Sequence, residues 1–197
     1  MLDKKNFYID GKWVSPIEPR NFKVIDPSNE EPCAEISLGG KKDIDKAVSA
    51  AKKAFETWAF SKKEERLELL EKLYVVYKKR WAEMAKLIST EMGAPMKFST
   101  EMQAATGASH IKSFKNILKD FKFEKDLGEE KKNQKLLYEP KGVCALITPW
   151  NWPINQVNLK VIPALASACT IVLKPSEIAP LSSMLLAEMI DEVKFPP

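Results

Sequence analysis

The sequence predicts an α/β protein built on a partial, doubly wound parallel sheet that is flanked by helices and carries a projecting β-hairpin. Residues 141–197 alternate strand, helix, strand and helix with short loops, which is the pattern of parallel strands joined by crossover helices. Residues 43–118 repeat their apolar side chains at three-four spacing, as amphipathic helices do. Residues 119–139 are charged and partly alternating, which predicts the hairpin.

A tight hairpin is expected at the N-terminus. NFYIDGKWV (6–14) places aromatic and β-branched residues around Asp10-Gly11. This dipeptide favours a two-residue turn because glycine accepts positive φ. A loop is predicted from there to Gly40, interrupted by a short strand at Ala34–Leu38.

Helices follow from Asp43. DIDKAVSAAKKAFETW (43–58) carries its apolar residues on one stripe, with Asp43 as the predicted N-cap. A second helix is predicted to begin at Ser61, because Ser61 and Glu64 have the spacing of a capping box.

That second helix either continues or breaks before Trp81–Met92, and Gly93 with Pro95 is expected to end it. A further helix is predicted from about Phe98 to Leu118. The helical region therefore extends to the start of the hairpin.

The hairpin consists of FKFEKDL (121–127), a turn at 128–133 and QKLLYEP (134–140). Two interpretations are open at this point. The segment is either a surface excursion or a sheet edge that pairs with another subunit.

The C-terminal unit is predicted as strand KGVCALI (141–147), helix INQVNLKVIPALASA (154–168), strand CTIVLK (169–174) and helix LSSMLLAEMIDEV (181–193). The first strand reads as a buried one, because its apolar run does not alternate. The unit is Rossmann-like, but two parallel strands do not complete such a sheet. We therefore expect an uncovered apolar face and self-association.

Composition limits the function classes. Hydrophobic residues make up 45% and charged residues 29%, as in a globular protein with a real core. The 31 basic residues are interspersed with 27 acidic ones, which argues against a nucleic-acid partner. No apolar run approaches the roughly 20 residues of a membrane span, and no signal peptide is recognised. The three cysteines form no CxxC pair and accompany no histidine cluster, so we expect no metal site and a cytoplasmic location.

Two loops carry the candidate chemistry. Ligands of open α/β sheets bind at the carboxyl ends of the strands, where TPWNWP (148–153) and KPSE (174–177) should be neighbours. A carboxylate such as Glu177 can accept two hydrogen bonds from a ribose diol and would repel a 2′-phosphate, which favours NAD over NADP. The alternative is that Ser176 or Glu177 caps the following turn. No G-x-G-x-x-G or Walker loop is present.

Asn151 is an uncharged donor held between two tryptophans and two prolines, which suits a developing oxyanion. The alternative is a structural asparagine that bridges loop backbone. His110, the only histidine, lies in a helical pattern, where a structural role is expected. No G-x-S-x-G accompanies it, so a hydrolase is not favoured.

ITPWNWPINQVNLKVIPALASACTIVLKPSEIAPLSS (147–183) strongly resembles the NAD(P)-dependent aldehyde dehydrogenase superfamily. FYIDGKWV, the helix at 43–58, and Glu91 with Gly93 and Pro95 match the same family in order. The chain thus resembles the N-terminal portion of such an enzyme. One departure is Ala168, which stands where the family usually has glycine.

The resemblance implies a role for each matching residue. Asn151 would supply the side-chain half of the oxyanion hole, and Lys160 a proton relay, although a helix-surface lysine remains the alternative. NAD, with NADP as the other choice, would be held by two sets of residues: Ile147, Thr148, Pro149 and Trp150; and Lys174, Pro175, Ser176 and Glu177.

The resemblance also implies the domain plan. Residues 1–118 and 140–197 would be an incomplete NAD(P)-binding domain, and 119–139 a hairpin for homo-oligomerisation. The family oxidises an aldehyde to a carboxylic acid through a cysteine thiolate and a glutamate-activated water. No cysteine here matches that position, so the catalytic domain is expected to be absent from this chain and the chain inactive alone. The alternatives are a truncated, non-catalytic module that oligomerises, and a semialdehyde or acylating dehydrogenase.

Overall fold

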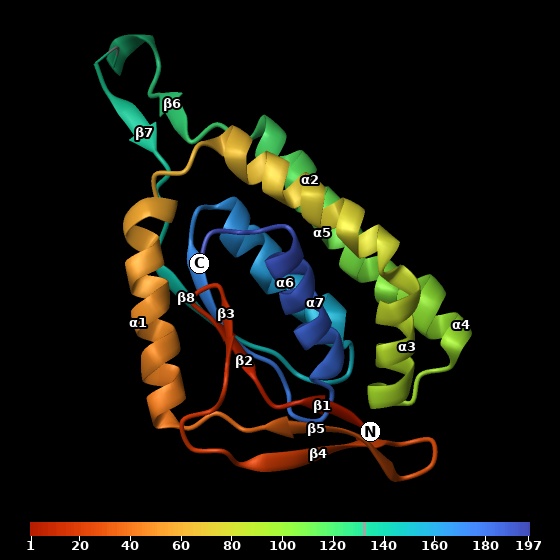
Figure 1. Cartoon of the computed structure of the whole chain (residues 1–197). Coiled ribbons are helices and arrows are strands. Elements are labelled where there is room, and N and C mark those ends of the chain that lie inside the picture. Colours follow the sequence, from red (N-terminus) through yellow and green to blue (C-terminus); the bar gives the residue numbers. More distant parts are fainter. Residues whose placement is uncertain (132) are drawn as a thin grey trace.

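Helices form most of this computed structural model, which describes residues 1–131 and 133–197. They surround a short parallel sheet, with the termini on the same side of the molecule as the small N-terminal sheets (Figure 1). The helices are α1 (Lys41–Trp58), α2 (Lys63–Lys79), α3 (Trp81–Met92), α4 (Met96–Phe98), a π-helical segment (Ser99–Gln103), α5 (Ala104–Asp120), α6 (Pro153–Ala166) and α7 (Leu181–Glu192).

The strands form four small sheets. β1 is parallel and β4 antiparallel to β5 in a three-stranded sheet, while β2–β3 and β6–β7 are antiparallel pairs and β8–β9 is a parallel pair. Their bounds are β1 (Leu2–Lys4), β2 (Phe7–Ile9), β3 (Lys12–Val14), β4 (Asn21–Asp26), β5 (Glu31–Ser37), β6 (Glu124–Asp126), β7 (Lys135–Leu137), β8 (Val143–Ile147) and β9 (Thr170–Lys174).

The predicted N-terminal hairpin is confirmed. Asp10 and Gly11 both have positive φ, 55° and 67°, as a type I′ turn between β2 and β3 requires. The loop predicted as far as Gly40 is wrong in part, because Asn21–Asp26 is strand β4. Its alternation points Val24 into a small core under β5, where the side chain is 1% exposed.

Two predicted helix starts are wrong. Asp43 is not the N-cap but the third residue inside α1, where its carboxylate accepts the N–H groups of Gly40 and Ile17, both at 2.9 Å. Burial raises the pKa of Asp43, but those two N–H donors outweigh it and the pKa is lowered. The capping box at Ser61 does not form. α2 begins at Lys63, and the Ser61 hydroxyl donates to the Trp58 carbonyl at 2.6 Å.

The remaining helix boundaries follow the sequence closely. The chain breaks at Arg80 between α2 and α3, and Gly93 ends α3 with φ 73°, the left-handed conformation that glycine tolerates. The helix predicted from about Phe98 to Leu118 is confirmed, with a π-helical segment near its start.

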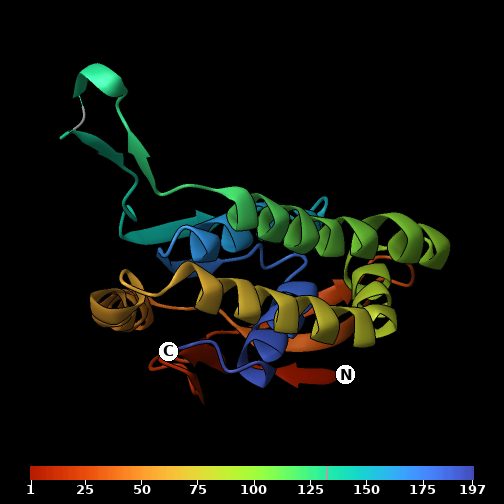
Figure 2. The same cartoon turned by 90° about the horizontal axis from the view of Figure 1, so that it is seen from above.

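The hairpin of β6 and β7 projects from the globule (Figures 1 and 2), but its predicted start at residue 119 is wrong, because α5 extends to Asp120. β6 and β7 pair antiparallel, and aromatic contacts at their base join Phe121 to Phe123 and Tyr138, with ring centroids 4.8 and 5.3 Å apart. The turn predicted at 128–133 includes Lys132, which lies outside the described residues. Every residue of β6 and β7 is exposed.

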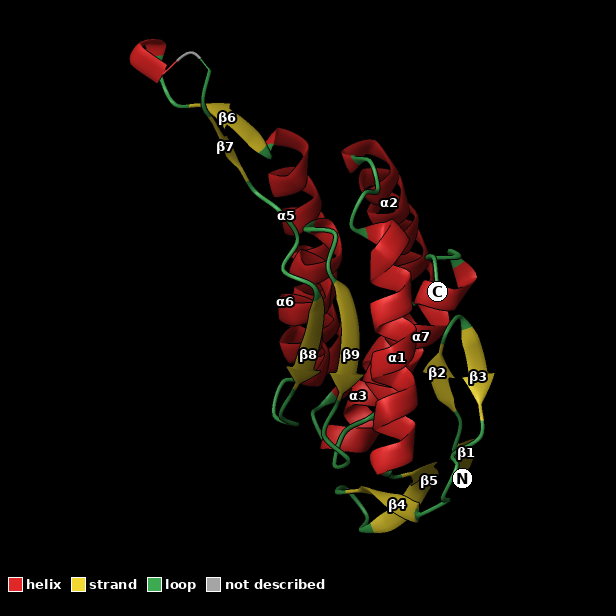
Figure 3. Ribbon diagram, turned by 90° about the vertical axis from the view of Figure 1, so that its left-hand side faces the viewer, coloured by secondary structure: helices red, strands yellow, loops and turns green. Residues whose placement is uncertain are grey.

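β8 and β9 form the predicted parallel pair, with Val143 opposite Thr170 and Ile147 opposite Lys174. The prediction that the first strand is buried is wrong, because β8 is partly exposed and Ile147 is 70% accessible. Seen from the α1 side, the strands lie in front of α6, with α1 beside β9 (Figure 3). One face of this sheet is therefore covered by α6 and the other is largely open.

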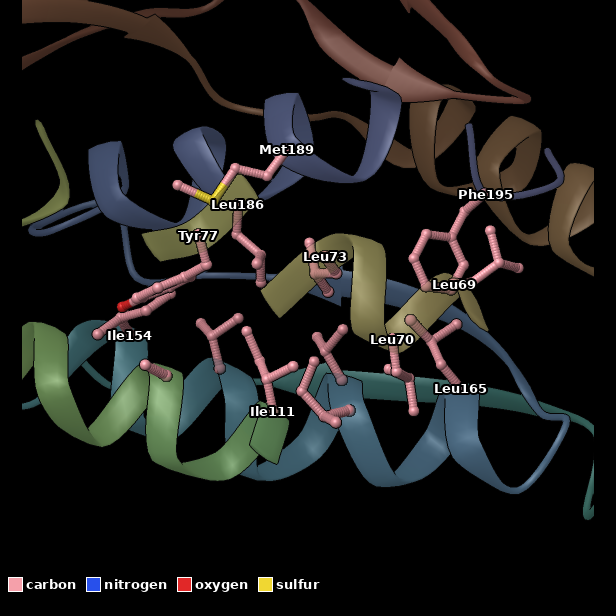
Figure 4. Packing of buried hydrophobic residues seen from close by; sticks show 14 of the residues in the cluster. Leu69, Leu70, Leu73, Tyr77, Ile111, Ile154, Leu165, Leu186, Met189 and Phe195 are labelled. Atoms are coloured by element: carbon pink, nitrogen blue, oxygen red, sulfur yellow. The ribbon is translucent and has the colours of Figure 1, made fainter. Parts of the chain in front are cut away.

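The main core lies among α2, α5, α6 and α7 (Figure 4). Tyr77 is fully buried and its hydroxyl donates to the Ala104 carbonyl at 2.9 Å. Gly107 allows this close packing, since a Cβ there would lie 2.3 Å from the Tyr77 oxygen. The core fixes α6, and with it the loop that precedes α6.

Candidate functional site

The carboxyl ends of β8 and β9 bring the two candidate loops together. Ile147 and Lys174 are register partners, and the Thr148 N–H donates to the Lys174 carbonyl at 3.3 Å. The predicted adjacency of the TPWNWP and KPSE loops is thus confirmed. Parallel pairing produces it, because both strands end at the same edge.

The loop after β8 presents Asn151 to solvent. Thr148 is buried at the strand end, whereas Trp150 and Asn151 are exposed. Trp152 packs edge-on against Phe98 with centroids 5.5 Å apart. Pro153 then opens α6, a position that suits proline because the first helical N–H needs no partner.

The Asn151 amide is consequently held at the N-terminus of α6, where the helix dipole favours negative charge. A purely structural asparagine would hydrogen-bond loop backbone. Within the described ranges the exposed Asn151 side chain makes no such bond. The amide is available to a ligand.

The KPSE loop is organised by an ion pair. Lys174 Nζ lies 2.8 Å from Glu177 Oε2, and this hydrogen bond lowers the pKa of Glu177, so the side chain is a carboxylate at neutral pH. The Ser176 hydroxyl accepts the Ile178 N–H at 3.2 Å. Ser176 therefore has the turn-capping role of the alternative interpretation, while Glu177 has oxygen lone pairs left for a diol.

In the described part of the chain, the hydrogen bonds of Lys160 go to Gln156 and not to Asn151. Lys160 lies about two turns into α6, where its ammonium group donates to the Gln156 carbonyl at 3.2 Å and to Gln156 Oε1 at 3.4 Å. The side chain is half-buried rather than a fully exposed surface lysine.

Two polar residues near this region, His110 and Glu91, make contacts that the sequence did not predict. His110 of α5 reaches α6, with Nε2 2.7 Å from Asn155 Oδ1. Because 45 residues separate the partners, no local motif could have indicated the contact. Glu91 is the second.

Glu91 lies at the other strand-to-helix junction. It is 1% exposed and accepts the N–H groups of Leu181 and Ser182, the first two residues of α7. Burial raises the pKa of Glu91 to about 7, against the opposing effect of these donors. Glu91 thereby fixes the loop between Glu177 and α7.

Two of the three thiols lie away from Asn151. Cys144 is near the start of β8 and Cys169 immediately precedes β9, so both are at the opposite end of the strands from the candidate loops. Cys33 is on β5. Over residues 1–131 and 133–197, no group of three or more His, Cys, Asp or Glu side chains could hold a metal ion. In the same part of the chain, no helix combines the length and hydrophobicity needed to cross a membrane.

Comparison with known proteins places these features in a family. The model of the aldehyde dehydrogenase family matches residues 13–197. The chain is 48% identical to a Pseudomonas sp. 3-succinoylsemialdehyde-pyridine dehydrogenase, covering 100% of this chain and 41% of that protein. The chain therefore spans about two fifths of the length of such relatives.

Solved structures agree. A Bartonella henselae aldehyde dehydrogenase superposes with a TM-score of 0.97 at 55% identity, covering 100% of this chain and 41% of that one. A variant of Pseudomonas syringae aldehyde dehydrogenase C, crystallised with NAD+ and octanal, gives 0.94 at 39% identity, covering 98% and 39%.

Proposed function

The chain belongs to the aldehyde dehydrogenase family, and we propose that it forms the dinucleotide-binding part of an enzyme that oxidises an aldehyde to a carboxylic acid with NAD. The observation that carries this proposal is that the loops bearing Asn151 and Glu177 begin side by side at the carboxyl edge of one parallel pair. A neutral amide donor at this edge suits the oxygen of a carbonyl substrate. An ionised carboxylate there suits the ribose hydroxyls of a dinucleotide.

The residues at this edge fit NAD. Glu177 would accept the hydroxyls of the adenosine ribose, with Lys174, Pro175 and Ser176 shaping the loop around it. Ile147, Thr148, Pro149 and Trp150 would line the cofactor along β8; the exposed apolar surface of Ile147 and Trp150 supports this. When bound, NAD would accept the hydride of the oxidation. The Glu177 carboxylate favours NAD over NADP, because a 2′-phosphate would be repelled.

Asn151 would donate its amide N–H to the oxygen of the aldehyde as negative charge develops there. Removing one such donor costs roughly 2.7–4 kcal/mol of transition-state stabilisation in other enzymes. Lys160 is proposed to serve in a proton relay, with its ammonium group held in place by the carbonyl and side-chain amide oxygens of Gln156. These roles make Asn151 and Lys160 the catalytic candidates.

The chain alone is proposed to be inactive, because Cys144 and Cys169 lie at the opposite end of the strands from Asn151, Cys33 does not match the position of the family's nucleophile, and the family reaction needs a thiolate beside the oxyanion donor. Asn151 without that nucleophile can polarise a carbonyl but cannot form the covalent intermediate.

Calorimetry tests the cofactor site directly. We expect the chain to bind NAD weakly, and to bind NADP more weakly still. Glu177→Gln should reduce the difference between the two affinities. Glu101→Gln, at an exposed position on the π-helical segment, is the matched control. Equal affinities of the wild-type chain for NAD and NADP would refute the assignment of Glu177, and production of NADH from an aldehyde by the 197 residues would refute the proposed inactivity.

Two further proposals concern substrate and assembly. A semialdehyde is a second candidate substrate, because the 48% identical relative is named as a semialdehyde dehydrogenase; an acylating reaction would be recognised by its need for coenzyme A. The hairpin 119–139 is proposed to pair with a second copy of the chain, through strands that are exposed on both faces and an apolar set comprising Leu127, Leu136, Leu137 and Tyr138.

A further inference from the structure

The only histidine of the chain bridges two helices beside the candidate site. His110 of α5 is half-buried, and its Nε2 lies 2.7 Å from Oδ1 of Asn155, which is also half-buried. A carboxamide oxygen carries no proton, so the imidazole N–H is the donor of this bond. The arrangement leaves the two N–H groups of the Asn155 amide and the Nδ1 of His110 for another partner.

The position of the pair connects it with Asn151. Asn155 is the third residue of α6, in the helical turn that follows the Asn151 loop. The aromatic contact between Trp152 and Phe98 closes one side of the same turn. Asn155 is therefore within one helical turn of the loop whose amide is proposed to hold the reacting carbonyl.

A structural role alone does not account for the pair. The seam between α5 and α6 already has a fully buried polar clamp, in which Asn158 Nδ2 donates to the Gly107 carbonyl at 2.9 Å. Ile111 of α5 and Ile154 of α6 both belong to the buried apolar core that holds these helices (Figure 4). The His110–Asn155 bond is at the accessible side of this seam, where water can reach both partners.

We propose that His110 and Asn155 form a specificity-determining pair that binds a hydrogen-bond acceptor on the tail of the aldehyde. The inference rests on the proposed function. His110 fixes the orientation of the Asn155 amide by donating to its oxygen, so the amide N–H groups are aimed away from His110. Their partner is an oxygen or ring nitrogen a few bonds from the reacting carbonyl, and a plain alkyl chain would leave them unpaired, at a cost in affinity.

Nuclear magnetic resonance tests the pair on the intact chain, because a single histidine gives one assignable set of ring signals. The probes are butanal, with an alkyl tail; 4-oxopentanal, with a ketone; and succinic semialdehyde, with a carboxylate. We expect the two acceptor-bearing aldehydes to shift the His110 ring and Asn155 side-chain amide signals and to bind at least fivefold more tightly than butanal. Asn155→Leu should reduce that preference to less than twofold.

Asn116→Leu, the same substitution at an exposed position of α5, is the control and should keep the preference. The side-chain amide of Asn151 reports separately on the proposed function. If Asn151 responds to all three aldehydes but the chain shows no preference, or the preference survives Asn155→Leu, the pair has no role in specificity. If no aldehyde shifts Asn151, the proposed function fails and this inference with it. The wild-type measurement decides even where Asn155→Leu does not fold.

Discussion

Ionisation of Glu91 is expected to make the stability of this chain fall between pH 4.5 and 8.5. The side chain is completely enclosed where α3 meets the start of α7, and burial raises its pKa from 4.5 to about 7. A group whose pKa is higher in the folded state stabilises fully below its unfolded pKa, and that contribution is lost as the pH rises through the folded value. The rise from 4.5 to about 7 corresponds to about 3 kcal/mol.

Urea unfolding, followed by tryptophan fluorescence across this pH range, measures the effect against Glu91→Gln. The glutamine cannot ionise, and the cost of its altered hydrogen bonding to Leu181 and Ser182 is the same at every pH. We therefore expect the free energy of unfolding of the variant, relative to that of the wild type, to rise by about 3 kcal/mol as the pH rises from 4.5 to 8.5.

Glu188→Gln is the control, because the pKa of Glu188 is lowered despite burial, by hydrogen bonds from Lys4 and Arg80. The stabilisation by Glu188 is present above the unfolded pKa and is lost only at lower pH. The difference in unfolding free energy between this variant and the wild type should therefore stay constant across the same range. A difference between Glu91→Gln and the wild type that is constant with pH, or that changes in the opposite direction, would show that the two helix N–H donors outweigh burial.

Three more predictions concern packing and assembly. Gly107→Ala should destabilise by about 1–3 kcal/mol in urea unfolding, because its Cβ would lie 2.3 Å from the Tyr77 oxygen; Gly39→Ala, with 3.7 Å to its nearest neighbour, should have little effect, and equal losses would disprove the steric argument. Leu73→Ala removes a fully buried side chain and should cost about 2–5 kcal/mol by the same assay, so a loss under 1 kcal/mol would mean that the site collapses around it. Leu137→Lys, on the exposed hairpin, should lower the mass measured by light scattering, and a wild-type chain that is already monomeric would contradict pairing through this edge.

Local chemistry explains which elements could be predicted. Asp10-Gly11 specifies its turn through backbone φ alone, and Gly93 ends α3 for the same reason. Strand β4 was not predicted because few of its residues point inward. Its pairing with β5 depends on how the chain folds back, which the local sequence does not show. The cap predicted at Ser61 failed because its hydroxyl found a carbonyl in the preceding turn, a competition that spacing does not reveal.

The candidate site likewise has features that could be predicted from the sequence and features that could not. The meeting of the two loops could be predicted, since parallel strands bring Ile147 and Lys174 to one edge whatever their side chains do. The contact between His110 and Asn155 could not, because it depends on how α5 crosses α6. Ala168, where the family usually has glycine, does adopt the left-handed φ of 61°, so the backbone turn is kept despite the Cβ.

The central position of α7 in the core affects when the core can close during synthesis. Leu185, Leu186 and Met189 enter the middle of the main core, although α7 follows α2, α5 and α6 in the sequence. Chains fold as their segments leave the ribosome, earlier segments first. The nascent α2, α5 and α6 therefore keep an apolar surface open to water until α7 has also left the ribosome.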